Sequence, residues 1–295
     1  MKIAVLMSTY NGQKFLNEQL KSLAEQTVKE SMVVYIRDDG SKDDTFDIIN
    51  MWKDRLNIIL FKEDNAGPAL SFWNLLMNPE IQADYYAFCD QDDIWDSNKL
   101  QVAIEKLSYN VCLYACNCRI INEFGQVVRK QRLEEPPIIN IPRLFVSGCT
   151  QGCSMVFTDS LRQYLMKLKV QCIPMHDVIL MLYAVGYGDI YWDQEPRFSY
   201  RVHSNNVVAK ENKSIFKSLK TTYWNWKNSS KNSMTEVAAE MSSNVTDLTH
   251  EDALFLKKIA NYRKNRFSLI RECKNYNIQH GALCSFRIRI VLGLY

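Results

Sequence analysis

The sequence of 295 residues lacks the features that mark several classes of protein. It has no run of about 18 apolar residues, so it offers no ordinary membrane-spanning helix. The apolar residues 3–7 pass directly into the polar residues 8–12, and this stretch is too short for a secretory signal. We expect a first strand there. No internal repeat is present, and at 47% hydrophobic content the chain can bury a full core.

Cysteine is present, but its arrangement excludes two common uses. No Cys-x₂-Cys pair occurs, and no His stands at ligand spacing near Cys116, Cys118, Cys149 or Cys153, so we expect no zinc site. Nine scattered cysteines, an odd number, argue against a disulfide scaffold and favour a reducing cytoplasm. We expect them to act as small buried apolar side chains.

The most informative segment is Asp90-Gln91-Asp92-Asp93, which follows the aromatic, strand-like residues 84–89. Like charges so close together raise one another's pKa unless a cation neutralises them. Oxygen ligands at the carboxyl end of a strand suit Mg²⁺ or Mn²⁺ shared with a substrate phosphate. The alternative is an acidic surface turn in which Asp93 or Asp96 caps the next helix.

Strand and helix patterns alternate through the first hundred residues. The expected strands are residues 2–7, 32–36, 57–61 and 85–89, and the expected helices are residues 15–23, 45–52, 69–77 and 97–107. This alternation predicts an α/β fold with a parallel sheet covered on both faces. Ligands bind outside the carboxyl ends of such strands, and polar residues follow all four of them.

The second half is less regular. A hairpin is expected from residues 111–121 and 126–128, and the Pro-rich residues 135–142 should form a loop. Further expected elements are strands at 155–158 and 197–202 and helices at 160–168 and 178–185. Beyond about residue 210 the chain has a helical pattern.

Seven motifs occur in order along these segments: Ser8-Thr9-Tyr10-Asn11-Gly12, Arg37-Asp38-Asp39-Gly40-Ser41-x-Asp43, Asn65-x-Gly67, Asp90-x-Asp92-Asp93, Gly148-Cys149-Thr150, His176-Asp177 and Tyr200-Arg201-Val202-His203-Ser204-Asn205-Asn206. Together, over about residues 1–208, they resemble the inverting family 2 glycosyltransferases, and the last two resemble the bacterial rhamnosyltransferase-type branch. The resemblance implies the GT-A fold, a Rossmann-like mixed sheet flanked by helices with a helical C-terminal extension. It implies a catalytic domain at 1–210, with a nucleotide-sugar-binding half at 1–110 and an acceptor-side half at 111–210, and a basic extension at 211–295.

The resemblance implies a donor site at the strand ends. The residues assigned to nucleotide-sugar binding are Thr9, Tyr10, Asn11, Asp39, Asn65, Asp90 and Arg201. Asp39 is implied to accept the imide N–H of the base, which suits uracil or thymine, although turn chemistry alone also explains Asp-Asp-Gly. Asp92 is expected to ligate a divalent metal, Mn²⁺ or Mg²⁺. His203 would complete the metal shell or touch the diphosphate, and Arg201 would pair with phosphate.

The acceptor side is implied to carry the catalytic base, Asp177. It opens a helix whose dipole favours the ionised carboxylate, and an N-cap role is compatible with this. His176 stands where the family typically has Glu, a departure that the rhamnosyltransferase-like branch shares. The residues assigned to the acceptor and sugar pocket are Trp95, Gly148, Cys149, Thr150 and His176. Core packing explains Trp95 nearly as well.

Charge is distributed unevenly. Residues 211–295 carry 14 Lys and Arg against 7 Asp and Glu, although the whole chain has a net charge of only +3. Residues 223–227 and 286–292 interleave apolar side chains with cations, as a helix lying on an anionic membrane surface requires. The alternative is that these helices pack on the catalytic domain or on a second copy, which would give a homodimer.

These inferences predict a cytoplasmic, metal-dependent, inverting glycosyltransferase, peripheral on the inner face of the plasma membrane. It would move a sugar, by hypothesis L-rhamnose from dTDP-rhamnose, onto a lipid-linked saccharide acceptor during synthesis of a bacterial surface polysaccharide of the capsule or cell wall. The alternatives are a UDP-dependent galactosyl- or glucosyltransferase, a nucleotidyltransferase and a non-catalytic carbohydrate-binding module. A nucleotidyltransferase normally has a Gly-rich, basic phosphate loop, which residues 8–12 lack. An acidic site argues against a nucleic-acid partner.

Overall fold

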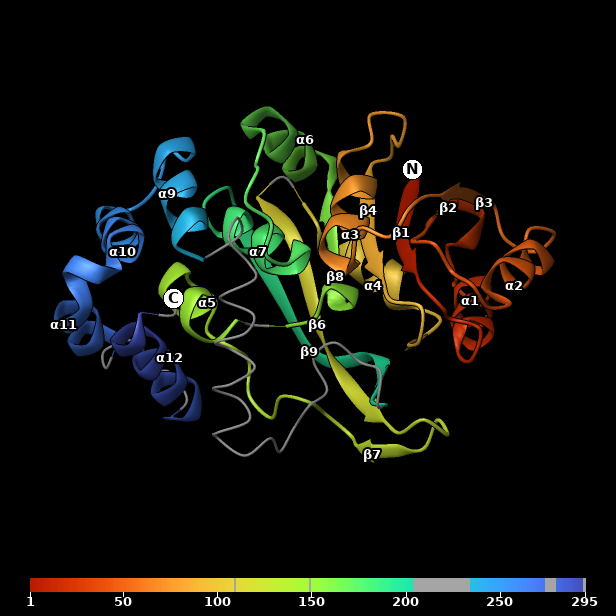
Figure 1. Ribbon diagram of the computed structural model, residues 1–295. Coiled ribbons are helices and arrows are strands. Elements are labelled where there is room, and N and C mark those ends of the chain that lie inside the picture. The colour runs from red at the N-terminus through yellow and green to blue at the C-terminus, as the bar shows by residue number, and fades with distance from the viewer. Residues whose placement is uncertain (109, 149, 204–233, 274–279, 294–295) are drawn as a thin grey trace.

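The computed structural model describes residues 1–108, 110–148, 150–203, 234–273 and 280–293 (Figure 1). The strands are β1 Ile3–Thr9, β2 Met32–Asp38, β3 Ile58–Lys62, β4 Tyr85–Cys89, β5 Ile94–Trp95, β6 Val111–Ile121, β7 Val127–Arg129, β8 Met155–Thr158 and β9 Asp189–Arg201. The helices are α1 Leu16–Ala24, α2 Thr45–Trp52, α3 Pro68–Met77, α4 Lys99–Lys106, α5 Ile141–Ser147, α6 Asp159–Leu168, α7 His176–Val185, α9 Met234–Asn244, α10 His250–Ala260, α11 Tyr262–Glu272 and α12 His280–Leu292.

The strands form one mixed sheet in the order β3-β2-β1-β4-β8-β6-β9-β5, with β7 paired to β6. β2 is parallel to β1 and β3, and β4 is parallel to β1, so the carboxyl ends of these four strands meet at one edge. β8 runs antiparallel to β4 and β6, and β5 antiparallel to β9. The mixed α/β sheet expected from the sequence is confirmed.

The central strand β1 explains why helices cover both faces of the sheet. Ile3, Val5 and Met7 pack with residues of α1, α2 and α4 in one buried cluster. Ala4 and Leu6 pack with residues of α3, α6 and α7 in the other. Successive side chains of a strand point to opposite faces, so a strand that is apolar throughout must be buried on both sides.

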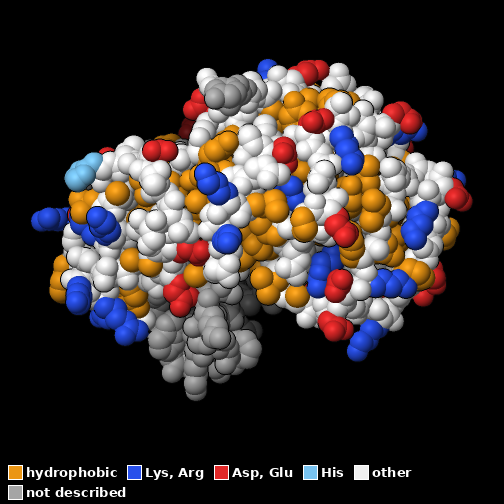
Figure 2. Space-filling model, turned by 90° about the horizontal axis from the view of Figure 1, so that it is seen from above, with side chains coloured by type: hydrophobic (Ala, Val, Ile, Leu, Met, Phe, Trp, Pro, Cys, Tyr) orange, Lys and Arg blue, Asp and Glu red, His pale blue; other side chains and the backbone are white. Residues whose placement is uncertain are grey.

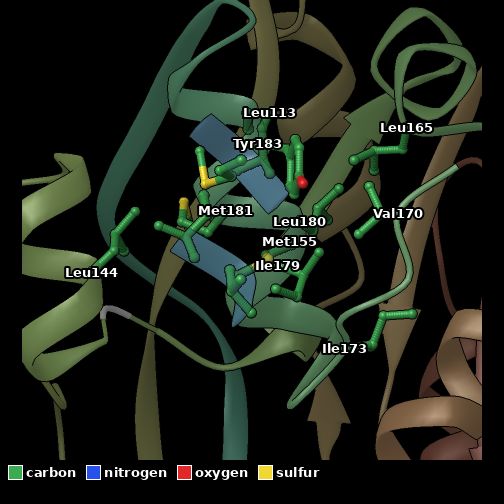
Figure 3. Packing of buried hydrophobic residues seen from close by; sticks show 14 of the residues in the cluster. Leu113, Leu144, Met155, Leu165, Val170, Ile173, Ile179, Leu180, Met181 and Tyr183 are labelled. Carbon is green, nitrogen blue, oxygen red and sulfur yellow. The ribbon is translucent and has the colours of Figure 1, made fainter. Parts of the chain in front are cut away.

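Helix α7 is held firmly by the second of these clusters. Figure 3 shows Ile179, Leu180 and Met181 of α7 packed beside Met155 of β8 and Leu113 of β6. Its residues are buried on nearly every side, which is typical of a helix inside a core. The first turn of α7, which carries His176 and Asp177, is therefore fixed relative to the sheet.

Most expected elements are confirmed, and four of them (α2, β4, β6 and β8) have the predicted bounds. Three features were missed: the short strand β5, the first part of β9 before residue 197, and helix α5, which Asn140 caps by accepting from the backbone N–H of Arg143 at 2.9 Å. The N-cap role considered for Asp93 is wrong, because β5 intervenes and α4 begins after Asn98.

The described C-terminal helices pack on the rest of the chain. Phe286 and Ile290 of α12 and Phe255 of α10 are buried in the same cluster as α5 and α7, and the rings of Phe255 and Phe145 lie 6.0 Å apart. The inner face of α12 is thus occupied by the protein itself. Residues 223–227 lie outside the described residues. None of the described helices has both the length and the apolarity to span a membrane.

The cysteines behave as the sequence predicts. The described cysteines are free thiols, and most are buried. Cys149 lies outside the described residues.

Candidate active site

Polar side chains from neighbouring strands meet at the carboxyl edge of the sheet. In the parallel register Thr9 of β1 is level with Asp38 of β2, and Thr9 Oγ1 donates to Asp38 Oδ1 at 2.9 Å. The backbone N–H of Asp39 donates to the Thr9 carbonyl oxygen at 2.8 Å. Asp90 directly follows β4, which pairs with β1 on its other side. The fold therefore brings these segments together at one edge.

The Asp39 carboxylate is buried and already engaged. It is paired with the guanidinium of Arg37 and accepts from the backbone N–H groups of Ala66 at 3.0 Å and Gly67 at 2.9 Å. Asn65 Nδ2 donates to the Asp39 carbonyl oxygen at 3.0 Å. Asp39 and Asn65 thus fasten the β3–α3 loop to β2. An incoming base would meet a carboxylate with only part of its lone-pair capacity left.

Gln91 connects the loop after β1 to residues 90–93, which follow β4 and are called the acidic loop below. Its amide accepts from the Tyr10 N–H at 2.9 Å and donates to the Tyr10 carbonyl at 3.1 Å. A Cβ added at Gly12 would lie 2.3 Å from Gln91 Oε1, so only glycine allows this approach. Asn11 has a φ of 47°, and its Oδ1 accepts from the Lys42 N–H at 2.9 Å. The Tyr10 side chain, 46% exposed, remains open to solvent.

Three carboxyl groups crowd together after β4. Ligand atoms of Asp90, Asp93 and Cys153 lie within 4.8 Å of one another. Burial, and then the Asp92 charge, raise the pKa of Asp90 to about 7 and that of Asp93 well above its usual range. Burial also raises the pKa of Cys153, which remains a neutral thiol. Asp93 Oδ2 is buried and has no hydrogen-bond partner among the described residues. Carboxyl groups crowded in this way ionise together only beside a cation.

Asp92 and His203 form the part of the cluster best suited to a metal. Their Oδ2 and Nε2 atoms lie 2.7 Å apart, with both side chains largely buried. Adjacent ligand atoms around an octahedral Mg²⁺ or Mn²⁺ stand about 3 Å apart, so a small widening would admit an ion. Carboxylate with imidazole is a suitable donor pair for Mn²⁺. The residues present therefore fit a divalent cation.

Arg201 lies beneath this cluster and is fully buried. Its guanidinium donates to the Asp92 carbonyl oxygen at 2.9 Å, to the Glu123 carbonyl oxygen at 3.2 Å and to Glu18 Oε2 at 2.9 Å. It also lies 4.7 Å from the ring of Phe15. These protein groups occupy much of the donor capacity of the guanidinium, and the phosphate-binding role expected for Arg201 stays a prediction. Arg201 fixes the backbone of the acidic loop.

Asp177 faces the same cluster from the first turn of α7. Its Oδ1 accepts from the Val178 N–H at 2.7 Å, and burial raises its pKa to about 6. The charge of Asp177 also raises the pKa of Asp90, so the two carboxyl groups lie within electrostatic reach of each other. At neutral pH the Asp177 carboxyl is mostly ionised, as a general base must be.

Gly152 permits the close approach of α7 to the loop before β8. A Cβ at this position would lie 2.6 Å from His176 Nε2 and 3.3 Å from the Asp177 Cβ. We expect Gly152→Ala to displace the first turn of α7 and lower kcat at least about tenfold, because displacement of Asp177, the residue expected to act as the base, by a fraction of an ångström is costly. Steady-state kinetics with donor and acceptor would measure this.

The matched control is Gly186→Ala, at the other end of the same helix. Its Cβ would meet the Val245 side chain at 3.2 Å, away from Asp177. An equal loss of kcat in both variants would show that general helix strain, and not the position of Asp177, is responsible.

His176 is a core residue in this structure. Its ring stacks on Phe72 with centroids 4.1 Å apart and meets Phe88 edge-on at 4.7 Å. Both ring nitrogens are buried with no hydrogen-bond partner among the described residues, and burial lowers the pKa of His176 to about 3. The imidazole is thus packed among core aromatic rings, and the acceptor-side role expected for His176 stays a prediction.

His176 should make the fold acid-sensitive. In the unfolded chain it takes up a proton below about pH 6.5, whereas the folded protein resists protonation until about pH 3. At pH 7 His176 is neutral in both states and does not reduce the free energy of unfolding. As the pH falls below about 6.5, the free energy of unfolding decreases by up to about 1.4 kcal/mol per pH unit. We expect urea unfolding at pH 7, 6 and 5 to show that the wild type loses free energy of unfolding, relative to His176→Leu, as the pH falls. A difference independent of pH would contradict this account.

The other described residues predicted for the acceptor and sugar pocket lie in three different places. Trp95 is only 3% exposed and packs in the core cluster of α1 and α4, so its ring is not at the surface of the site. Gly148 ends α5 with a φ of 66°. Thr150 is half-buried and bonds Ser154 Oγ at 3.1 Å, two residues from the Gly152 contact with α7.

Sequence reasoning missed two buried partners of the acidic loop. Cys153 was assigned only a packing role, although its thiol lies beside Asp90 and Asp93. Lys99 was not singled out within the expected helix 97–107, yet its ammonium is fully buried, lies 3.6 Å from the Trp95 ring centroid and interacts with the charge of Asp93. No local pattern reveals either contact, because both depend on the packing of α4 and of the turn before β8 against the sheet.

Comparison with known proteins identifies what this chain is similar to. The family model described as Glycosyl transferase family 2 matches residues 4–165. The dTDP-rhamnosyl transferase RfbG of Shigella flexneri is 29% identical over 217 residues, covering 69% of this chain and 73% of that protein. The glucosyltransferase WfaP of Escherichia coli, described as UDP-Glc:alpha-D-GlcNAc-diphosphoundecaprenol beta-1,3-glucosyltransferase, is 27% identical over 225 residues, covering 73% of this chain and 83% of that protein.

Solved structures share the fold at low identity. TarS 1–349 of S. aureus in complex with UDP-GlcNAc superposes with a TM-score of 0.64 at 18% identity, covering the whole of this chain and 80% of that one. The mannosyltransferase PcManGT of Pyrobaculum calidifontis, in complex with GDP-Man and Mn²⁺, gives a TM-score of 0.56 at 15% identity, covering the whole of this chain and 81% of that one. The architecture is that of GT-A glycosyltransferases.

Proposed function

This chain belongs to glycosyl transferase family 2, and from that premise we propose that it is a metal-dependent, inverting enzyme with Asp177 as its base. A glycosyltransferase of this kind moves a sugar from a nucleotide donor to an acceptor hydroxyl. The finer assignments below concern the metal, the base, the donor and the acceptor.

One observation carries the proposal: a Cβ at Gly152 would lie 3.3 Å from the Asp177 Cβ, and the next residue, Cys153, lies beside Asp90 and Asp93. This proximity of Asp177 to the acidic residues after β4 supports a single site that contains both the proposed metal ligand and the proposed base. Asp92 and His203, 2.7 Å apart, would hold the ion. A bound divalent cation would supply positive charge to the departing nucleoside diphosphate.

Asp177 would act on the acceptor hydroxyl. Its carboxylate takes the proton of the acceptor hydroxyl as that oxygen bonds to the anomeric carbon of the donor sugar. The bond from that carbon to the diphosphate oxygen breaks in the same step, and its electron pair leaves with the diphosphate. Attack from the face opposite the leaving group inverts the anomeric centre without a covalent intermediate.

We propose dTDP-L-rhamnose as the donor, with a UDP-hexose as the second candidate. Similarity to the dTDP-rhamnosyl transferase RfbG supports the first, as do the His176-Asp177 pair and the motif that contains His203. Similarity to the UDP-Glc-dependent WfaP supports the second at nearly equal identity. Both pyrimidines carry an imide N–H, so Asp39 does not separate them.

The acceptor in this proposal is a lipid-linked saccharide of a bacterial surface polysaccharide. The name of WfaP includes a diphosphoundecaprenol acceptor, which supports this choice. The enzyme would then work at the inner face of the plasma membrane, where such an acceptor can meet a cytoplasmic nucleotide sugar.

A product assay tests the proposal. The chain is incubated with a panel of dTDP- and UDP-sugars, with and without Mn²⁺, and release of nucleoside diphosphate is measured. We expect turnover of dTDP-rhamnose, at least as slow hydrolysis. If no nucleotide sugar is bound or consumed with any divalent ion, the proposed function is wrong.

Removal of the metal gives a separate prediction. Chelation by EDTA should lower turnover at least about a hundredfold, and Mn²⁺ should restore it, because the proposed cation neutralises the charge of the leaving diphosphate. Asp92→Asn should weaken Mn²⁺ binding, measured by calorimetry without donor. Asp84→Asn, which removes an exposed carboxylate before β4, is the control and should bind Mn²⁺ as the wild type does.

A further inference from the structure

The outward face of α11 carries a concentrated set of cations around one apolar ring. Phe267 is 90% exposed, the largest exposed fraction among the described apolar side chains. Arg263, Phe267 and Arg271 follow one another at intervals of four residues and so share one stripe of the helix, with Lys264 beside it. All four side chains are exposed.

The opposite stripe of α11 packs on the protein. Tyr262 and Leu269 are buried in the main core cluster, and Arg266 donates to the Val291 carbonyl oxygen of α12 at 3.2 Å. The single acid of α11, Glu272, is paired with Lys258 of α10 and accepts from Ser268. Glu272 also interacts with the charge of Arg271, but it is the single acidic side chain of α11, so the exposed stripe keeps a net positive charge.

The stripe lies at one end of the molecule. In Figure 1, α10 and α11 form the left-hand end. Figure 2 shows Lys and Arg side chains gathered at this same end, with apolar side chains between them. Val291, where α12 meets α11, adds a second apolar side chain that is 56% exposed.

We propose that this stripe of α11 docks the protein on an anionic lipid bilayer, with Phe267 entering the interfacial region and the three cations contacting lipid headgroups. An exposed aromatic ring with cations beside it suits a bilayer surface, because the ring can enter the interfacial region while the cations contact anionic headgroups. The choice of lipid over other polyanions rests on the lipid-linked acceptor of the proposed function. The site differs from the membrane segments expected from the sequence, residues 223–227 and 286–292.

Vesicle co-sedimentation tests this with the full chain and no sugar substrate. Vesicles of phosphatidylglycerol and phosphatidylcholine are compared with vesicles of phosphatidylcholine alone. Each cation near an anionic surface strengthens binding about fivefold, so the triple variant Arg263→Gln, Lys264→Gln, Arg271→Gln should bind about a hundredfold more weakly. Phe267→Ala should lose about tenfold. The wild type should bind only the anionic vesicles.

Matched controls test whether vesicle binding depends on the exposed stripe of α11 or on any exposed cations and aromatic rings. Lys21→Gln, Lys29→Gln, Lys53→Gln removes three exposed cations from the N-terminal half, and Phe124→Ala removes a ring that is 79% exposed on the β6–β7 turn. Both should keep wild-type binding. Equal losses in the controls, or binding unchanged in the α11 variants, would overturn the proposal. Loss of self-association in sedimentation velocity without loss of vesicle binding would assign the face to a second copy instead. Because no donor is present, a failure of the proposed function leaves this result intact.

Discussion

Asp177→Asn should lower kcat by about 10² to 10⁴-fold while leaving donor and Mn²⁺ binding within about twofold of the wild type. Asparagine keeps the size of the side chain but cannot take the acceptor proton, which is the contribution expected of a general base. The backbone N–H of Val178, which bonds the Asp177 side chain at 2.7 Å, can bond the amide oxygen in its place. Kinetics and calorimetry together would measure both effects.

The pH profile of the wild type gives the same prediction by another route. Only the ionised Asp177 can act as a base, and burial raises its pKa to about 6. The value of kcat/KM should therefore be flat above about pH 7 and fall about tenfold per unit below pH 6. An ordinary aspartate would shift this limb to about pH 4.

Asp159→Asn is the matched control for Asp177. It also lies in the first turn of a helix, α6, but it bonds the Tyr86 hydroxyl, away from the proposed site. Its activity should be unchanged. A residual activity of more than a tenth in Asp177→Asn, or an equal loss in Asp159→Asn, would remove Asp177 from the reaction.

Arg201→Met should both destabilise the protein, by about 3 kcal/mol, and weaken Mn²⁺ binding. The substitution removes a buried cation that donates to the Asp92 carbonyl oxygen and to Glu18, and such losses are costly. With the acidic loop released, Asp92 and His203 would no longer be held in place for the ion. Urea unfolding and calorimetry with Mn²⁺ would measure the two effects.

Arg162→Met separates these effects. Arg162 is also almost fully buried, and it donates to the carbonyl oxygens of Leu76 and Asn78, both at 2.7 Å. Neither contact touches the acidic loop. The control should therefore lose comparable stability but keep Mn²⁺ affinity in its folded fraction. Arg201→Lys should recover part of the Mn²⁺ affinity. Equal Mn²⁺ affinity in the two methionine variants would mean that Arg201 is purely structural.

Local patterns in the sequence were sufficient to predict the helices and strands in the first half of the fold. The elements of residues 45–52 and 85–89 were predicted to the residue, because hydrophobic period and turn residues agree there. β9 was found only in part, since Pro196 argues against a strand. In the structure Pro196 lies opposite Asn117 where the register of β6 and β9 shifts, so the missing N–H breaks no regular ladder.

The sequence predicted which residues belong to the site, but it did not predict their distances and contacts. The motif order brought Asp90, Asp92 and Asp177 into one hypothesis, but the distance between them depends on how α7 packs under the sheet. Arg201 was assigned to phosphate because a cation near a diphosphate is expected to bind it. Its burial against Glu18 depends on α1, almost two hundred residues away in the sequence, and no local signal reports it.

A crystal of this protein grown with Mn²⁺ and a nucleoside diphosphate, measured for anomalous scattering, tests the central claim most directly. We predict one manganese peak bonded to Asp92 and His203, with the Asp177 carboxylate in the same cavity and the diphosphate between them. A peak remote from Asp92, or an Asp177 side chain that does not border the cavity holding the nucleotide, would contradict the account.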